Sequence, residues 1–85
     1  MLTEMKLEHL VGNRYTLLEL EETLEMFEGS SVKIAFVDTT DTERYFEDED
    51  YKMDIETKEG TGTIWYARTR DRKYYITEVE FSIRY

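Results

Sequence analysis

The spacing of apolar residues changes at Gly29, where a helical period of 3.6 gives way to the period of two that is typical of strands. From residue 17 to residue 28, apolar side chains recur every three or four positions. Thr16 and Glu19 are placed to form a capping box, and Gly29 stands where a left-handed residue ends a helix. The pattern therefore predicts a helix over residues 17–28. Its expected core stripe is Leu17, Leu20, Leu24 and Phe27.

Residues 2–11 fit both periods. As a strand, Thr3, Met5 and Leu7 alternate with charged residues; as a helix, Leu7, Leu10 and Val11 share a face, and the following Gly12 ends it. The helical propensity of Leu, Glu, Met and Lys favours the helix slightly. Both alternatives stay open at this stage.

The chain beyond Gly29 reads as strands. Residues 32–37 are apolar on both faces, which predicts a central and well-buried strand. Residues 51–58 and 63–69 alternate, and Gly60–Gly62 and Arg70–Lys73 are the expected turns. The last strand is expected to place one set of side chains on one face: Tyr75, Thr77, Val79, Phe81, Ile83 and Tyr85.

These elements predict a single α+β domain over residues 1–85. One N-terminal helix, or two if residues 2–11 are helical, packs on an antiparallel meander of about four strands. No linker, repeat or low-complexity tract divides the chain, and it contains no proline. The helix stripe is expected to lie on the sheet face that carries Ile34, Ile55, Val79 and Phe81.

Charge narrows the choice of partners. The formal net charge of −9 argues against binding nucleic acid or an anionic membrane, so the expected partners are basic. Glu4, Lys6 and Glu8 interrupt what would be the apolar part of a signal peptide, and the apolar runs are far too short to span a bilayer. Without cysteine, neither a disulfide framework nor a thiolate metal site is available. We therefore expect a cytoplasmic protein.

Catalytic and metal-binding patterns are missing from the sequence. His9 and the serines show no spacing that suggests an activated nucleophile, and with twenty acidic residues a carboxylate pair would arise by chance. The acidic run Asp38–Asp50 lacks the spacing of a calcium-binding loop, because Glu43 stands where that loop needs glycine. We expect no enzyme activity, no cofactor and no dedicated metal site.

Two acidic segments are the candidate binding surface. Five glutamates lie between residues 19 and 28, about one charge per ~3 Å of helix axis, close to the ~3.4 Å between phosphates of one DNA strand. Ten carboxylates and three basic residues lie between residues 38 and 59. The candidate acidic residues are Glu21, Glu22, Glu25, Glu28, Asp38, Asp41, Glu47, Asp48, Glu49, Asp50, Asp54 and Glu56.

The leading hypothesis is an inhibitor that imitates the phosphate backbone of DNA or RNA and occupies the basic surface of a nucleic-acid-binding protein such as a nuclease. In size, charge and lack of catalytic residues, the chain resembles the small acidic inhibitors that phages and mobile elements make against CRISPR nucleases and restriction enzymes. The resemblance is one of composition, so no functional residue is carried over. Mimicry would require the helical and loop carboxylates to form one continuous surface.

The alternative is an accessory subunit that docks through an aromatic sheet face or an edge strand. Its candidate residues form two adjacent pairs, Trp65 with Tyr66 and Tyr74 with Tyr75, which place rings on both faces of the sheet. Leu18 and Met26 fall on the acidic side of the helix; we expect them to pack under the N-terminal segment, with exposed apolar anchors as the alternative.

The basic hairpin Arg68–Lys73 is interpreted as a solvated tip, with pairing to an acidic surface of the same chain or of a second copy as the alternative. It also makes the chain dipolar, so a homodimer, if one forms, would be expected to be head-to-tail.

Overall fold

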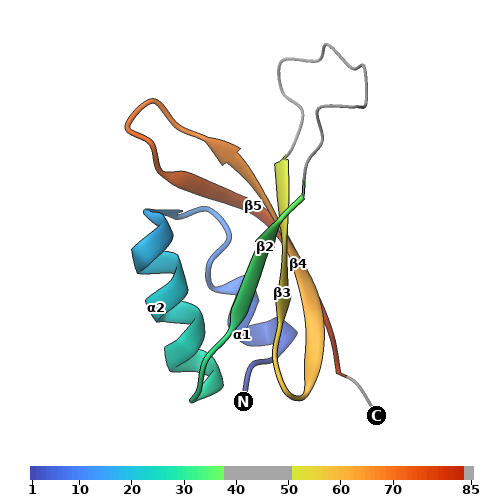
Figure 1. The fold of residues 1–85 in the computed structure, drawn as a ribbon. Coiled ribbons are helices and arrows are strands. Elements are labelled where there is room, and N and C mark those ends of the chain that lie inside the picture. The colour runs from blue at the N-terminus through green and yellow to red at the C-terminus, as the bar shows by residue number, and fades with distance from the viewer. Residues whose placement is uncertain (38–50, 84–85) are drawn as a thin grey trace.

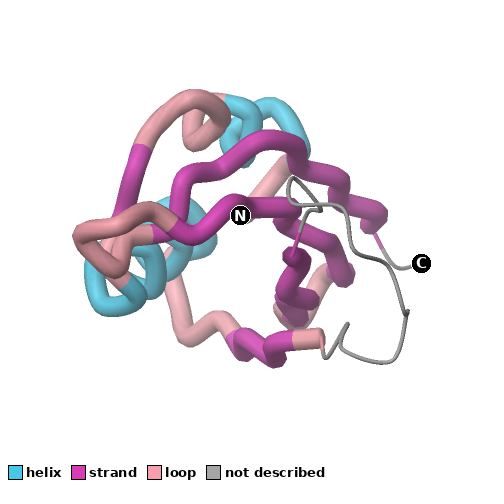
Figure 2. The backbone as a smooth tube through the Cα atoms, turned by 90° about the horizontal axis from the view of Figure 1, so that it is seen from above, coloured by secondary structure: helices cyan, strands magenta, loops and turns pink. Residues whose placement is uncertain are grey.

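The computed structural model describes residues 1–37 and 51–83, and it confirms the α+β class with an antiparallel sheet. The structure contains the second helix that the prediction left open, and a fifth strand adds to the predicted layout. The elements are α1 (Glu4–Glu8), β1 (Arg14–Tyr15), α2 (Leu17–Glu28), β2 (Lys33–Phe36), β3 (Tyr51–Glu56), β4 (Gly60–Arg68) and β5 (Tyr74–Ile83). Both helices lie against the sheet, which curves around α2 (Figures 1 and 2).

Helix α2 has the predicted bounds and caps. The Glu19 N–H donates to Thr16 Oγ1 over 3.1 Å, and the Thr16 N–H donates to Glu19 Oε1 over 2.9 Å. Gly29 ends the helix in the left-handed region with φ of 89°. The core stripe was wrong at Leu17, which is 39% exposed. Leu17 is the first helical residue and has no preceding turn on which to pack.

Helix α1 resolves the ambiguity of residues 2–11 in favour of a helix. Thr3 caps it by accepting a hydrogen bond from the Lys6 N–H. Leu2, Leu7 and Leu10 are fully or almost fully buried in the core. The following two-residue strand β1 pairs with β5 and was not predicted, because two residues carry no detectable period.

The sheet has the order β1-β5-β4-β3-β2 with antiparallel neighbours throughout. The register places Ile34 opposite Ile55 and Ile64 opposite Val79, so these residues share the face toward the helices, as expected. We call this the helix face and the opposite one the outer face. The prediction that residues 32–37 form a central, well-buried strand was wrong. β2 is an edge strand, in which Lys33, Ala35 and Phe36 are exposed.

Two details of the β3–β4–β5 meander differ from the alternation in the sequence. The first turn comprises residues 57–59, while Gly60 and Gly62 lie inside β4. These glycines serve packing, because a Cβ on Gly62 would lie 2.8 Å from Cδ1 of Phe81. A register shift at Trp65/Tyr66 then reverses the faces near the start of β5. Ile76 is consequently buried, whereas Tyr75 and Thr77, expected beside Val79, are exposed on the other side.

Candidate protein-binding surfaces

The side of α2 that faces away from the sheet combines carboxylates with exposed apolar side chains. Leu18 is 63% exposed and Met26 is 71% exposed, so the expectation that they pack under the N-terminal segment was wrong. Glu22 lies between them along the helix, one turn from each, and is exposed; Glu21 and Glu25 beside it are half-buried. Helix α2 contains no basic residue. This α2 face is therefore acidic with two apolar projections.

Glu28 does not belong to that face. It is buried, and its Oε1 accepts a hydrogen bond of 2.7 Å from the Leu2 N–H. Burial alone would raise the pKa of the Glu28 carboxyl. That pKa is nevertheless held below its usual value. The causes are the hydrogen bond from Leu2, the hydrogen bond shared with Glu59, and the positive charges of the N-terminus and Lys6. Glu28 is therefore an anchor for the N-terminal segment.

The carboxyl end of α2 receives the positive charge that its own sequence lacks. Lys6 of α1 donates from Nζ to the Phe27 carbonyl over 3.2 Å and to the Met1 carbonyl over 2.7 Å. A cation at this end offsets the helix dipole and part of the repulsion among the glutamates. Because Lys6 belongs to α1, the sequence of α2 alone does not reveal this contribution.

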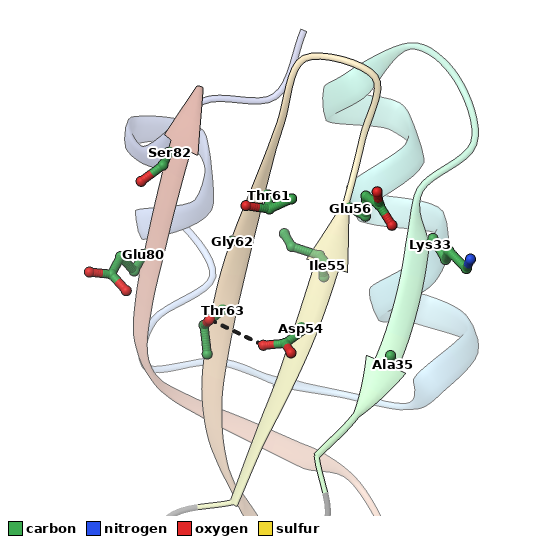
Figure 3. A pocket seen from close by; sticks show the side chains of 10 residues that line it. All are labelled: Lys33, Ala35, Asp54, Ile55, Glu56, Thr61, Gly62, Thr63, Glu80 and Ser82. Carbon is green, nitrogen blue, oxygen red and sulfur yellow. Dashed lines mark hydrogen bonds between the residues drawn. The ribbon is translucent and has the colours of Figure 1, made fainter. Parts of the chain in front are cut away.

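The outer face of the sheet carries the second acidic group that the structure describes. Asp54 and Glu56 of β3 lie there beside a hollow of about 560 Å³ (Figure 3). Thr63 donates to Asp54 Oδ1 over 3.3 Å, and Glu80 lies across β4 opposite Thr63. Lys33 lies on the same face, and its side chain points away from the sheet at the β2 edge. The outer face is thus polar and mixed in charge, with carboxylates in the majority around the hollow.

The two described acidic groups lie on opposite sides of the molecule, because α2 covers the helix face whereas Asp54 and Glu56 point outward (Figure 3). The carboxylates of α2 and those of β3 therefore do not form one continuous surface, whereas the loop carboxylates that mimicry would join to α2 lie outside the described residues. The remaining acidic candidates lie outside the described residues: Asp38, Asp41, Glu47, Asp48, Glu49 and Asp50.

The four predicted aromatic residues also divide between the faces. Trp65 and Tyr75 lie on the outer face, whereas Tyr66 and Tyr74 lie on the helix face. Tyr66 is buried, which raises the pKa of its hydroxyl. The rings therefore lie on both faces, as expected, and of these four residues Trp65 and Tyr75 lie on the face opposite the helices.

An aromatic cluster forms instead on the helix face and consists of Phe36, Tyr51, Tyr66 and Tyr74. Tyr66 lies at its centre, with ring centroids 4.9 Å from Tyr74, 5.9 Å from Tyr51 and 6.3 Å from Phe36. Phe36 and Tyr51 remain 48% and 42% exposed. Sequence reasoning missed both: residues 32–37 were interpreted as a buried strand, and Tyr51 was treated only as a strand residue.

The basic hairpin between β4 and β5 is organised by its own side chains. Thr69 donates to Asp71, which lowers the pKa of the Asp71 carboxyl, and Thr69 Oγ1 accepts from the Lys73 N–H over 3.0 Å. The Arg68 guanidinium lies 4.9 Å from the centre of the Tyr74 ring. These contacts fit the interpretation of a solvated tip.

Within residues 1–37 and 51–83, no three acidic or histidine side chains gather in a way that could hold a metal ion. In the same part of the chain, every helix is too short or too polar to cross a membrane. Comparison with protein-family models, curated proteins and solved structures finds no match to this chain.

Proposed function

We propose that this chain is a non-enzymatic acidic binding protein that occupies the basic surface of a nucleic-acid-binding protein, with α2 as its contact element. The observation that carries this proposal is the α2 face, on which Glu21, Glu22 and Glu25 surround the exposed Leu18 and Met26. Its proposed compartment is the cytoplasm, because a cysteine-free chain needs no oxidising surroundings.

The carboxylates of this face contribute little to the stability of the fold. Glu19 closes the capping box and Glu28 anchors Leu2, whereas Glu21, Glu22 and Glu25 have no hydrogen-bond or ion-pair partner among the residues that the structure describes. Glu25 also lies near the carboxyl end of α2, where the helix dipole disfavours negative charge. A surface kept acidic at some expense of stability is typical of a binding role.

The chemistry favours an arginine- or lysine-lined groove. Such a groove tracks a nucleic-acid backbone through point charges, and closely spaced carboxylates on a rigid helix present a comparable array. Leu18 and Met26 would add apolar contacts at the centre of the interface, which phosphate cannot supply. Long-range attraction from the net charge of −9 makes association fast and dependent on salt.

The test is a capture experiment with three baits from a native lysate. The first bait is the wild type, and the second carries Glu21→Gln, Glu22→Gln and Glu25→Gln; glutamine keeps similar helix propensity, so α2 should remain folded. The third carries Asp54→Asn, Glu78→Gln and Glu80→Gln, which remove the same charge from the outer face, where Glu78 is exposed opposite Trp65. Captured proteins are eluted with low salt, high salt or competing duplex DNA.

We expect the wild type and the outer-face variant to retain a nucleic-acid-binding protein that high salt and duplex DNA both displace. The α2 variant should bind that protein roughly tenfold or more weakly when affinity is measured with the purified pair. Equal affinity for the α2 variant, or a partner that duplex DNA does not displace, would contradict the proposal.

A further inference from the structure

One edge of β2, the edge that faces away from β3, is exposed among the described residues. β2 is the last strand of the sheet and pairs with β3 on one side only, as far as residues 1–37 and 51–83 show. Lys33, Ala35 and Phe36 are exposed, and Ile34 is half-buried. A bulge or a proline normally prevents another strand from pairing with an edge. β2 contains no bulge, and the chain contains no proline.

The ladder to β3 shows which backbone groups point outward. The Val37 N–H donates to the Lys52 carbonyl over 3.1 Å, so residues with the same parity as Val37 bond to β3. In an antiparallel ladder, alternate residues exchange both hydrogen bonds with the same neighbour. Ala35 therefore bonds inward, whereas Ile34 and Phe36 direct their N–H and carbonyl groups to the free edge.

The side chains beside this edge differ between the two faces of the sheet. On the helix face, Phe36 continues into the aromatic cluster, with its ring 5.9 Å from that of Tyr74. A residue paired with Ile34 or Phe36 would direct its side chain to this face. An apolar side chain would there cover the exposed part of Phe36, which amounts to 48% of its surface.

On the outer face, the same edge leads into the acidic hollow. Ala35 pairs with Asp54, Asp54 with Thr63, and Thr63 with Glu80, so the four residues form one row across the sheet. A residue added opposite Ala35 would stand about 10 Å from Asp54, two strand spacings away, with only the Ala35 methyl group between them. The extended side chain of arginine or lysine can span most of that distance and place its charge beside the Asp54 carboxylate. Lys33 lies two residues before Ala35 on the same face, so the residue opposite Lys33 must not be basic, because like charges directly opposite each other are destabilising.

We propose that the free edge of β2 binds an extended segment of a partner protein as an additional antiparallel strand, in which apolar residues alternate with polar ones and a basic residue stands opposite Ala35. The apolar residues pair with Ile34 and Phe36 and pack on the aromatic cluster, while a basic residue opposite Ala35 reaches toward Asp54. A second copy of this chain fits less well, because two chains of charge −9 repel each other. The β2 edge does not involve the α2 face, so variants can test each surface separately.

The first experiment uses three capped seven-residue peptides. The first, the valine–lysine peptide, is Val-Thr-Val-Lys-Val-Thr-Val, so that its lysine can stand opposite Ala35 while a threonine stands opposite Lys33. The second contains the same residues with the four valines in one block, and in the third, the valine–glutamate peptide, glutamate replaces the lysine. We expect saturable binding of the valine–lysine peptide in a titration followed by amide NMR signals, with the largest shifts at residues 33–37. The other two peptides should bind roughly tenfold or more weakly.

The second experiment uses N-methylation to test the geometry of strand addition. Only the valines, which pair with Ile34 and Phe36, would donate backbone hydrogen bonds to β2. Methylating the valine amides should therefore weaken binding roughly tenfold or more, whereas methylating the threonine and lysine amides of the same peptide should leave affinity nearly unchanged. Equal effects of the two methylations would overturn strand addition, as would a lack of saturable binding by the parent peptide at millimolar concentration.

A pair of protein variants tests the outer-face contact. Asp54→Asn should lower the affinity for the valine–lysine peptide several-fold, and it should not lower the affinity for the valine–glutamate peptide. Glu22→Gln on α2 removes the same charge far from β2 and should change neither affinity. If the two variants have the same effect, the basic residue of the peptide is not recognised beside Asp54 and the proposed sequence preference is wrong.

Discussion

The two edges of the sheet differ in how far other parts of the described chain cover them. At the β5 edge, β1 pairs with the start of the strand, the Ile76 N–H donates to the Asn13 carbonyl over 3.0 Å, and the Gly12 N–H donates to the Ile76 carbonyl over 2.8 Å. Glu4 of α1 lies farther along, where its Oε1 accepts from the Phe81 N–H over 3.4 Å. At the β2 edge, the described residues offer no comparable cover.

Among the described residues, the chain therefore covers the β5 edge with β1 and α1 and leaves the β2 edge open. Natural sheets usually protect a free edge with charge, proline or a bulge, because a free edge otherwise recruits other strands. At β2 the only charged residue is Lys33. The open edge also borders the exposed part of the aromatic cluster, so the backbone and the side chains there are accessible together.

The largest expected effect is at the covered edge. Leu7 of α1 is fully buried, so Leu7→Ala should lower the free energy of unfolding by about 2–5 kcal/mol. Phe36→Ala at the open edge should lower it by only about 1–2 kcal/mol, because the ring is half exposed and contributes chiefly through its aromatic contacts. Urea unfolding followed by Trp65 fluorescence measures both. Equal losses would mean that β2 is as firmly integrated as the covered edge.

A smaller effect is expected from the anchor that holds the N-terminal segment against the fold. Glu28→Ala leaves the buried Leu2 N–H without its acceptor and should lower the free energy of unfolding by about 1–3 kcal/mol at neutral pH. Glu22→Ala on the exposed side of α2 is the matched control and should change stability by less than about 0.5 kcal/mol.

The pH dependence of the Glu28 variant has a definite sign. Because folding lowers the pKa of Glu28, its carboxylate stabilises the folded state fully above the ordinary value of 4.5. That contribution is lost as the pH falls through the lowered value. The difference between the wild type and Glu28→Ala should therefore shrink in acid, as measured by thermal unfolding from pH 7 to pH 3. A difference that grows in acid would contradict the assignment.

The sequence carried enough information for α2 and for the fold class, because capping and period are local signals. Thr16, Glu19 and Gly29 mark both ends of α2 within the helix itself. The position of β2 in the sheet is a non-local property. Residues 32–37 are apolar on both sides, a pattern that suits a central strand, yet here Ile34 packs on the core while Phe36 completes an exposed cluster.

The candidate surfaces were predicted less well, for related reasons. The face of each strand residue depends on register, and one bulge moved Tyr75 and Thr77 away from Val79. Glu28 matched an acidic surface by composition, but its role depends on Leu2, which is 26 residues away. The exposure of Leu18 and Met26 likewise depends on where α1 packs, and the residue pattern of the sequence does not reveal that α1 packs on β5.

The smallest expected effect concerns Glu59, which lies in the β3–β4 turn and shares a hydrogen bond with Glu28. That hydrogen bond is the largest cause of the raised pKa of the Glu59 carboxyl, and burial adds to it. One of its two carboxyl oxygens, Oε1, is buried and has no hydrogen-bond partner among the described residues. At neutral pH the two carboxylates repel each other next to the anchor of the covered edge.

Glu59→Gln should therefore raise the melting temperature slightly at pH 7, because the amide donates to Glu28 at every pH. A group with a raised folded pKa stabilises the fold below its ordinary value of 4.5 and loses this contribution as the pH rises through the folded value. Wild-type Glu59 regains its proton in acid, so the advantage of the variant should vanish there. Glu22→Gln, outside the pair, should show no such convergence. An advantage that persists at pH 3 would show that Glu59 acts through packing alone and does not share a proton with Glu28.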